Sequence, residues 1–358
     1  MSKFYDYFPG GNTSKGFYSF YRYIMPQSNA TRIFCLKGGP GTGKSSLMKK
    51  VSNYFAEKGY DIEYHHCSSD NNSLDGIVIK GLNVVLLDGT APHVVDPINP
   101  GAVDEILNMG ECWNADGFKE SHDNIIDCNK RVGNLFKAAY RYIGAAKLVH
   151  DDISTMNSSC LSLNKVNVLQ ANLANKIFTT PVSNLGNERH MFATALTPNG
   201  VITYIENLIQ DMENVYVLKG GPGLGRNEIL EYLSQEAIRH GYYVEIFHTP
   251  LKPERLEHII IPELKTAIVS SNELTKIEFN GTIINLEDNL NPYIADYSAK
   301  IEKANEYFWN LLSTGLSYIK EAKGNHDLLE NYYIPNMDFD KMNKIYDYVI
   351  NRIEAYEK

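Results

Sequence analysis

One glycine-rich segment has the residue types and the spacing of a phosphate-binding loop. Residues 38–45 read GGPGTGKS, which matches the pattern of two glycines separated by four residues and followed by lysine and serine or threonine. Glycines let successive backbone N–H groups point at one phosphate, and the N-terminus of a following helix adds partial positive charge. The residues expected to contact the phosphates are Gly38, Gly39, Pro40, Gly41, Thr42, Gly43, Lys44, Ser45 and Ser46.

Three side chains in and after this loop have the chemistry that Mg·ATP needs. Lys44 supplies a mobile cation for the β- and γ-phosphates, and the Ser45 hydroxyl is a hard oxygen ligand for Mg²⁺. Asp88 directly follows the apolar run 84–87, where a carboxylate at a strand end would orient the metal. An aspartate that only caps the turn before Gly89 is the alternative. We predict ATP and Mg²⁺ as cofactors, with Lys44 and Asp88 in catalytic roles and Ser45 and Asp88 as metal ligands.

The loop occurs twice in the chain. Residues 32–90 align without a gap with residues 214–272, and weaker matches extend on both sides, which indicates a tandem duplication. The second loop keeps its glycines but loses the phosphate cation and both oxygen ligands of Mg²⁺. The three replacements are Lys44 by Arg226, Ser45 by Asn227 and Asp88 by Ser270. We therefore expect the second half to keep the fold without Mg²⁺-dependent chemistry, and the guanidinium of Arg226 could still hold a phosphate in an anion pocket.

Candidates for proton transfer follow Asp88. His93 and Asp96 lie in a segment that the second copy does not share, so either is a candidate proton acceptor or water-positioning residue. A turn-rich loop with a satisfied histidine explains them equally well. His65 is a candidate for substrate contact because the second copy has phenylalanine there, whereas His66 recurs as His248 and is interpreted as structural.

The hydrophobic pattern predicts the elements that position these residues. Alternating strands and helices indicate an α/β fold with a mostly parallel sheet flanked by helices in each half. The halves are expected at 1–180, the active lobe, and 181–358, the degenerate lobe, joined by a polar linker over 179–187. The expected elements of the first half are strands at 33–36, 61–66 and 84–87, an amphipathic helix at 45–58 and a short helix near 74–79. The remainder of each half has helical spacing.

Composition narrows the classes of function. The chain of 358 residues has a formal net charge of −9, which argues against a nucleic-acid partner. No apolar run is long enough to cross a membrane, and the N-terminus lacks the apolar region of a secretory signal. Five cysteines without paired spacing favour reduced thiols. A cytoplasmic protein is expected.

Several segments together resemble one family. With FPGGNTSKGFYSF, IFCLKGGPGTGKSSLMKK, EYHHCSSD and LLDGTAPHVVDPINPGAVDEI, the chain resembles tandem P-loop proteins of Firmicutes-type bacteria that are described only as ATP-binding proteins or ATPases. The likeness covers essentially the whole chain. It implies nucleotide binding at residues 38–46 and Asp88 and implies no substrate.

These observations favour an ATP- and Mg²⁺-dependent P-loop NTPase with its active site in the first half. Its reaction would be ATP hydrolysis or phosphoryl transfer to a small molecule. The absence of a glutamate directly after Asp88 favours kinase-like or switch-like P-loop proteins over molecular motors. The alternative is a nucleotide-gated regulatory protein with little turnover, in which the partner would be another protein.

Overall fold

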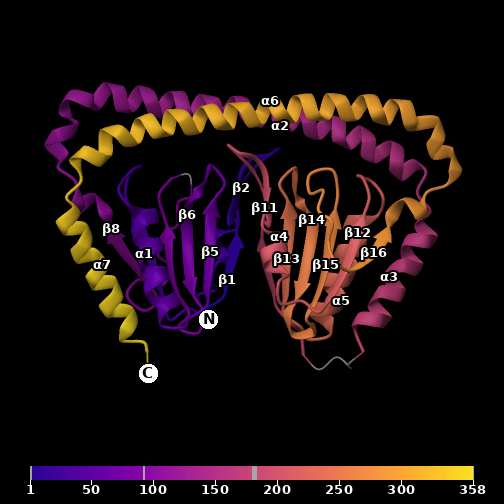
Figure 1. Ribbon diagram of the computed structural model, residues 1–358, viewed down its shortest axis with the longest axis horizontal. Helices are drawn as coiled ribbons and strands as arrows, with labels where there is room; N and C mark the ends of the chain where they lie inside the picture. Colours follow the sequence, from indigo (N-terminus) through magenta and orange to yellow (C-terminus); the bar gives the residue numbers. More distant parts are fainter. Residues whose placement is uncertain (1, 92, 180–183, 358) are drawn as a thin grey trace.

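The computed structural model describes residues 2–91, 93–179 and 184–357, which form two α/β lobes side by side (Figure 1). Each lobe contains one six-stranded sheet, and the strand order is the same in both, which confirms the duplicated α/β architecture. The first sheet is ordered β1 (Phe4–Tyr7), β5 (Ile62–Cys67), β6 (Asp70–Ile79), β7 (Val84–Asp88), β4 (Arg32–Lys37) and β8 (Asp104–Asn108). The second is ordered β9 (Glu188–Met191), β13 (Val244–Thr249), β14 (Lys252–Ile261), β15 (Thr266–Ser271), β12 (Asn214–Lys219) and β16 (Thr282–Asn285).

Each sheet is mostly parallel, as predicted, and is mixed because one strand runs antiparallel to the rest. Strand β4 is parallel to β7 and β8, and β1 is parallel to β5, but β6 is antiparallel to both of its neighbours. The short helix predicted near residues 74–79 is therefore wrong, because this run forms the second half of β6. Its residues are buried against α1 on one face and against the core between the lobes on the other, and a run buried on both faces, with β-branched Ile77, Val78 and Ile79, favours a strand.

One helix follows each glycine loop, as the sequence predicts. Helix α1 (Lys44–Glu57) buries Leu47, Met48, Val51 and Phe55 against the first sheet, and α5 (Arg226–Arg239) takes the same place in the second lobe. Gly59 ends the first of these segments with φ of 98°, a left-handed conformation that favours glycine.

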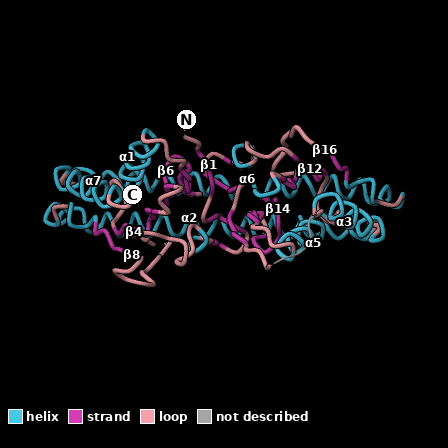
Figure 2. Tube along the Cα trace, turned by 90° about the horizontal axis from the view of Figure 1, so that it is seen from below, coloured by secondary structure: helices cyan, strands magenta, loops and turns pink. Residues whose placement is uncertain are grey.

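Two long helices cross both lobes. Helix α2 (His122–Ser159) and helix α6 (Ser298–Tyr333) lie along one another over the same end of the two sheets (Figure 1, top). Helix α3 (Leu163–Ile177) then packs on α5 of the second lobe, and α7 (Phe339–Glu354) packs on α1 of the first. Figure 2 shows these two pairs at opposite ends of the molecule. Each packed body thus combines a sheet from one half of the sequence with a helix from the other half.

The remaining elements are short. Two hairpins, β2–β3 and β10–β11, precede the glycine loops. Residues 180–183, within the predicted linker, lie outside the described part of the chain. The short elements are β2 (Gly10–Thr13), β3 (Gly16–Ser19), β10 (Thr194–Thr197), β11 (Gly200–Thr203), α4 (Ile205–Leu208) and the 3₁₀ turns Tyr21–Tyr23, Met109–Cys112, Ala115–Ser121, Pro262–Leu264, Leu286–Asn289, Pro292–Tyr297 and Ile334–Asn336.

The two lobes share a hydrophobic core at an approximate two-fold axis. Phe8 and Phe192, which are equivalent in the repeat, exchange two backbone hydrogen bonds of 3.0 Å each. Beside them the buried Arg189 donates to both carboxylate oxygens of Glu63, at 2.7 and 3.1 Å, and to Glu245 at 3.3 Å. The bidentate contact holds the pKa of Glu63 well below its ordinary value. This interface therefore joins the halves through both apolar and ionic contacts.

Among the described residues, no helix combines the length and the apolar character that a membrane span requires.

Candidate functional site

The first glycine loop connects the carboxyl end of β4 to the N-terminus of α1. Gly41 and Gly43 have φ values of 67° and 78°, which non-glycine residues rarely adopt. Gly43 occupies the N-cap position of α1, and no side chain caps that helix end. The first amides of α1 consequently keep N–H groups without intrahelical acceptors. This is a concave arrangement of donors suited to an anion.

Lys44 and Asp88 lie together beside the loop. The Lys44 ammonium donates to the carbonyl oxygens of Gly38 and Gly39, at 2.8 Å each, and lies 3.6 Å from Asp88 Oδ2. Strands β4 and β7 are adjacent and parallel, so their carboxyl ends bring the loop and Asp88 to one edge of the sheet. Both side chains are largely buried, which strengthens their attraction relative to an exposed pair.

Ser45 and Asp88 are each held by one backbone amide. The Ser45 hydroxyl oxygen accepts a hydrogen bond from the Leu74 amide at 3.0 Å, and Asp88 Oδ1 accepts from the Thr90 amide at 2.8 Å. Thr90 in turn donates its hydroxyl to the Gly38 carbonyl at 2.9 Å. These contacts orient the oxygens and leave lone pairs free. Hard oxygen donors of this kind fit Mg²⁺, so the residues present fit the predicted metal.

Residues of the second half cover the outer side of the first loop. A Cβ added to Gly39 would lie 2.8 Å from the Tyr333 ring, one on Gly41 would lie 3.2 Å from Ile334 and one on Gly43 would lie 2.5 Å from Met342. Close packing therefore disfavours a larger residue at these positions, and the positive φ of Gly41 and Gly43 independently favours glycine there. Tyr333 also contacts the rings of Trp113 and Phe118, which places a half-buried aromatic cluster next to the loop.

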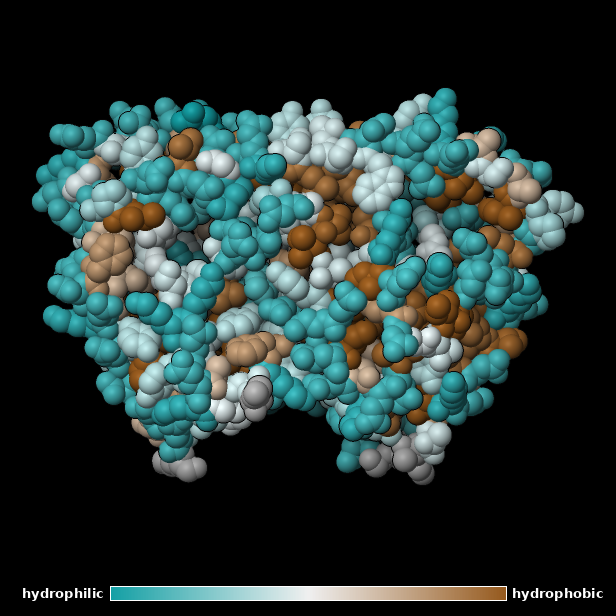
Figure 3. Space-filling view, in the orientation of Figure 1, coloured by the Kyte–Doolittle hydropathy of each residue, from teal (hydrophilic) through white to brown (hydrophobic). Residues whose placement is uncertain are grey.

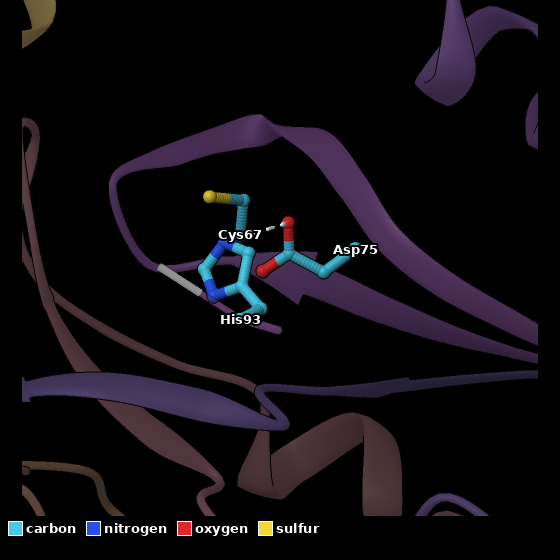
Figure 4. A group of neighbouring side chains, drawn as sticks. All are labelled: Cys67, Asp75 and His93. Atoms are coloured by element: carbon cyan, nitrogen blue, oxygen red, sulfur yellow. Dashed lines mark ion pairs between the residues drawn. The ribbon is translucent and has the colours of Figure 1, made fainter. Parts of the chain in front are cut away.

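The two candidates for proton transfer lie in different surroundings. Asp96 is exposed, with 74% of its side chain accessible, and forms an ion pair of 3.0 Å with Lys37. Lys37 also donates to the carbonyls of Gly89 and Val95, so the pair fastens the segment after β7 to the end of β4. His93 is buried and lies 3.8 Å from Asp75 on β6, with Cys67 of β5 close by (Figure 4).

The prediction that His65 contacts a substrate is wrong. Its side chain is completely buried, stacks on Tyr7 and lies 3.4 Å from Glu63 in the core between the lobes. Burial lowers the pKa of His65 to about 4. Because side chains alternate along a strand, His65 and His66 point to opposite faces of β5. His66 hydrogen-bonds Asp6 at 2.7 Å.

The second loop reproduces the contacts of the first with different side chains. Arg226 donates to the Gly220 carbonyl at 3.1 Å, and the Asn227 side-chain oxygen accepts from the Leu256 amide at 2.9 Å. Ser270 is buried and donates to the Glu257 carbonyl. A cleft of about 1860 Å³ opens beside this loop, between residues 219–224, the segment after β15 and α6. Hydrophobic side chains gather over this lobe in the space-filling view (Figure 3).

Several residues of the site escape sequence reasoning. Lys37 was assigned no role, although it joins the loop strand to the segment after Asp88. Asp75 lies in the run predicted as a helix, so the approach of its side chain to Cys67 could not be inferred. Tyr333 and Met342 lie almost 300 residues from the loop that they cover. The signal that the sequence offers for these residues is the comparison of its two copies, because Cys67 and His93 occur in the first copy and not in the second.

Comparison with known proteins gives one partial match. A family model described as "Nephrocystin 3, N-terminal" matches residues 19–79, which run from the end of β3 through the glycine loop and α1 to the end of β6. No curated protein and no solved structure matches the chain significantly. The matched segment contains the loop but neither Asp88 nor the second half.

Proposed function

We propose that the first lobe binds a nucleoside triphosphate with Mg²⁺, ATP in the first instance. The observation that carries this proposal is that Lys44 lies close to Asp88 at the N-terminus of α1, which follows the glycine-rich loop and has no side-chain cap. The partial match over residues 19–79 includes this loop. Backbone amides and a lysine offer charge to phosphates, and two oriented oxygens offer ligands to a hard cation.

Within such a complex each residue has a distinct task. Lys44 exchanges its carbonyl contacts for phosphate oxygens, and the first amides of α1 hold the same group. Ser45 and Asp88 hold the cation, which when bound neutralises developing phosphate charge. Thr90 keeps Asp88 oriented through its amide and keeps the loop closed through its hydroxyl. The reaction that this arrangement suits is hydrolysis or phosphoryl transfer to a small molecule.

Calorimetry with Mg·ATP tests the proposal. We expect binding by the wild-type protein and a loss of at least about tenfold in affinity for Lys44→Ala, since the charged contacts removed contribute roughly 1.5–3 kcal/mol. Arg226→Ala is the matched control, because Arg226 occupies the same position in the second lobe and should leave this binding unchanged. Equal affinity in wild type and Lys44→Ala would refute the proposal.

A nucleotide-gated regulatory protein with little turnover is the second candidate. The packing of Tyr333 and Met342 against the first loop favours it, because occupancy of the loop would be felt by α6 and α7. Helix α6 also contacts α2 along its length and β10 of the second lobe. A kinetic assay separates the candidates. Multiple turnovers of ATP favour the enzyme. Tight ATP binding with negligible phosphate release favours the regulator, as does a nucleotide-dependent change in the hydrogen-exchange protection of the amides of α6 and α7.

A further inference from the structure

Three side chains of the types that bind metal ions lie close together in the first lobe, outside the glycine loop. Cys67 ends β5, Asp75 lies on β6 and His93 follows β7 (Figure 4). One ligand atom from each lies within 4.8 Å of the others, and His93 Nε2 lies 3.8 Å from Asp75 Oδ1. Ligand atoms of one tetrahedral Zn²⁺ with bonds of about 2.0–2.3 Å stand roughly 3.3–3.8 Å apart, so the His93–Asp75 distance fits and the cluster would contract around an ion.

The polar atoms of this cluster are buried without partners. Asp75 is 4% exposed and His93 is 8% exposed. Within the described part of the chain, Asp75 Oδ2, His93 Nδ1 and the nearby Tyr21 hydroxyl make no hydrogen bond. An unpaired buried polar group costs about 1–3 kcal/mol, and more if it is charged. A ligand that engages several of these atoms at once would remove that cost.

Two aromatic rings fix the orientation of the histidine. The His93 ring stacks on Tyr21 at 4.9 Å between centroids and contacts Phe17 at 4.8 Å. Imidazole ligands work best when the ring is held in place before the metal arrives. The apolar surroundings also exclude water, which strengthens the attraction between a carboxylate, a thiolate and a cation.

The second lobe provides an internal comparison. Thr249 and Glu257 are the aligned equivalents of Cys67 and Asp75, and Thr275 contacts Glu257 much as His93 contacts Asp75, so this lobe lacks the sulfur and the imidazole. There one carboxylate oxygen of Glu257 accepts hydrogen bonds from Asn272 at 3.2 Å and Thr275 at 3.4 Å. Where the potential ligands are absent, hydrogen-bond donors engage one carboxylate oxygen, while among the described residues Glu257 Oε2 makes no hydrogen bond.

We propose that Cys67, Asp75 and His93 bind one Zn²⁺ ion, with a fourth position open to the Tyr21 hydroxyl or to water. A thiolate and an imidazole select zinc over Mg²⁺ or Ca²⁺, which prefer oxygen ligands. Strand register places this site next to the nucleotide site, since Gly76 pairs with Leu87 and the next residues are Asp75 and Asp88. The zinc site is nonetheless separate in its ligands from Lys44, Ser45 and Asp88.

Titration with Co²⁺, which replaces zinc and absorbs visible light, tests the site. We expect saturation at one ion per chain, a thiolate-to-cobalt charge-transfer band and displacement of the cobalt by Zn²⁺. The titration uses the full chain without nucleotide, in wild type and in Lys44→Ala. If the band is unchanged in Lys44→Ala, cobalt binding does not depend on the nucleotide site. The zinc proposal and the nucleotide proposal can then fail separately, and each failure can be recognised.

Variants taken from the repeat itself identify the ligands. Cys67→Thr and His93→Thr introduce the residues that the second lobe already accommodates at these places. Each should abolish or shift the band and weaken Co²⁺ binding by more than the roughly 10–100-fold that loss of an outer partner causes. Cys128→Ser is the control, because the Cys128 thiol is not part of the cluster and donates to the Asn325 carbonyl between α2 and α6. Absence of a charge-transfer band in the wild-type protein, or its persistence in Cys67→Thr, would overturn the proposal.

Discussion

At the scale of single residues, the two loops differ in their oxygen ligands more than in their cations. Lys44 and Arg226 both bind the first carbonyl of their loop, so each cation keeps its loop closed when no anion is bound. Asn227 also copies the amide contact of Ser45. The second lobe therefore makes the same backbone contacts with Arg226 and Asn227, and it carries neither the hydroxyl of Ser45 nor the carboxylate of Asp88 at these positions.

Replacement of His65 should make the protein less sensitive to acid. Burial lowers the pKa of His65 to about 4, from the ordinary 6.5. Between these pH values the unfolded chain binds a proton that the folded chain does not, so the free energy of unfolding falls as the pH drops from about 6.5 to 4. His65→Phe removes this proton and should flatten the dependence by roughly 3 kcal/mol over that window.

Urea unfolding at several pH values measures this effect. Burial raises the pKa of Glu257 to about 7, and a raised carboxyl pKa acts in the opposite direction, since its stabilisation is lost as the pH rises. That contribution is present in both proteins and cancels in the difference between them. Parallel curves for wild type and His65→Phe between pH 6.5 and 4 would contradict the prediction.

How much of the candidate site could be predicted from the sequence depends on how far apart its residues lie along the chain. Lys44, Ser45 and their glycines form one continuous motif, and Asp88 follows an unmistakable apolar strand, so a single chain suffices to propose them. Cys67 and Asp75 become neighbours only through an antiparallel pairing with a bulge. Nothing in their spacing along the chain reports that pairing, and the misassigned helix concealed it.

At the scale of elements, continuous apolar runs predict where strands lie, but they do not indicate which lobe a helix packs against. The runs at 33–36 and 84–87 became β4 and β7 because continuous burial requires cover on both faces. The apolar faces of α2 and α6, in contrast, are compatible with either lobe. The sequence could not reveal that each helix crosses to the other lobe.

Charge pairs distinguish the two crossings. Helix α6 reaches the first lobe with Lys323, which lies 3.4 Å from Asp70. Helix α2 reaches the second lobe with Asp151, which pairs with Lys252 at the equivalent place. Each helix carries a lysine and an aspartate four residues apart at this place, Lys147 with Asp151 and Lys323 with Asp327, and each lobe pairs with the member of opposite charge.

Helix α6 depends on a glycine where it touches α2. A Cβ on Gly315 would lie 2.8 Å from Ile143 and 3.3 Å from the Ala139 carbonyl. Gly315→Ala should therefore lower stability by about 1–3 kcal/mol from overpacking, reduced by the gain of about 1 kcal/mol in helix propensity. Thermal unfolding measures the balance, which we expect to be a lower melting temperature.

Gly324 in the same helix is the matched control. A Cβ there would meet no atom within 4 Å, so Gly324→Ala should stabilise the protein by about 0.5–1 kcal/mol. If both alanines raised the melting temperature, the close approach of α2 and α6 would not limit stability.

At the scale of the whole molecule, the exchanged helices make the halves interdependent. A protease site inserted between Thr179 and Asn184 separates the chain while leaving α3 on the second lobe and α7 on the first. We expect the cleaved halves to elute together in size-exclusion chromatography and to melt in one transition. Their melting temperature should then rise with protein concentration, because association has become bimolecular.

The uncut protein, whose melting temperature should not vary with concentration, is the reference for this experiment. Elution of two separate folded fragments would show that the α2–α6 contact and the Arg189–Glu63 pair are dispensable for the association of the lobes.

The reciprocal bond between Phe8 and Phe192 also bears on how such a chain could arise. Because these residues are equivalent, a shorter polypeptide with a single copy could meet a second molecule of itself through the same two backbone hydrogen bonds, as in a symmetric homodimer. Gene fusion would then convert an encounter between molecules into a permanent one. It would also free one copy to diverge, since a mutation at position 45 or 88 would no longer be imposed on both sites at once.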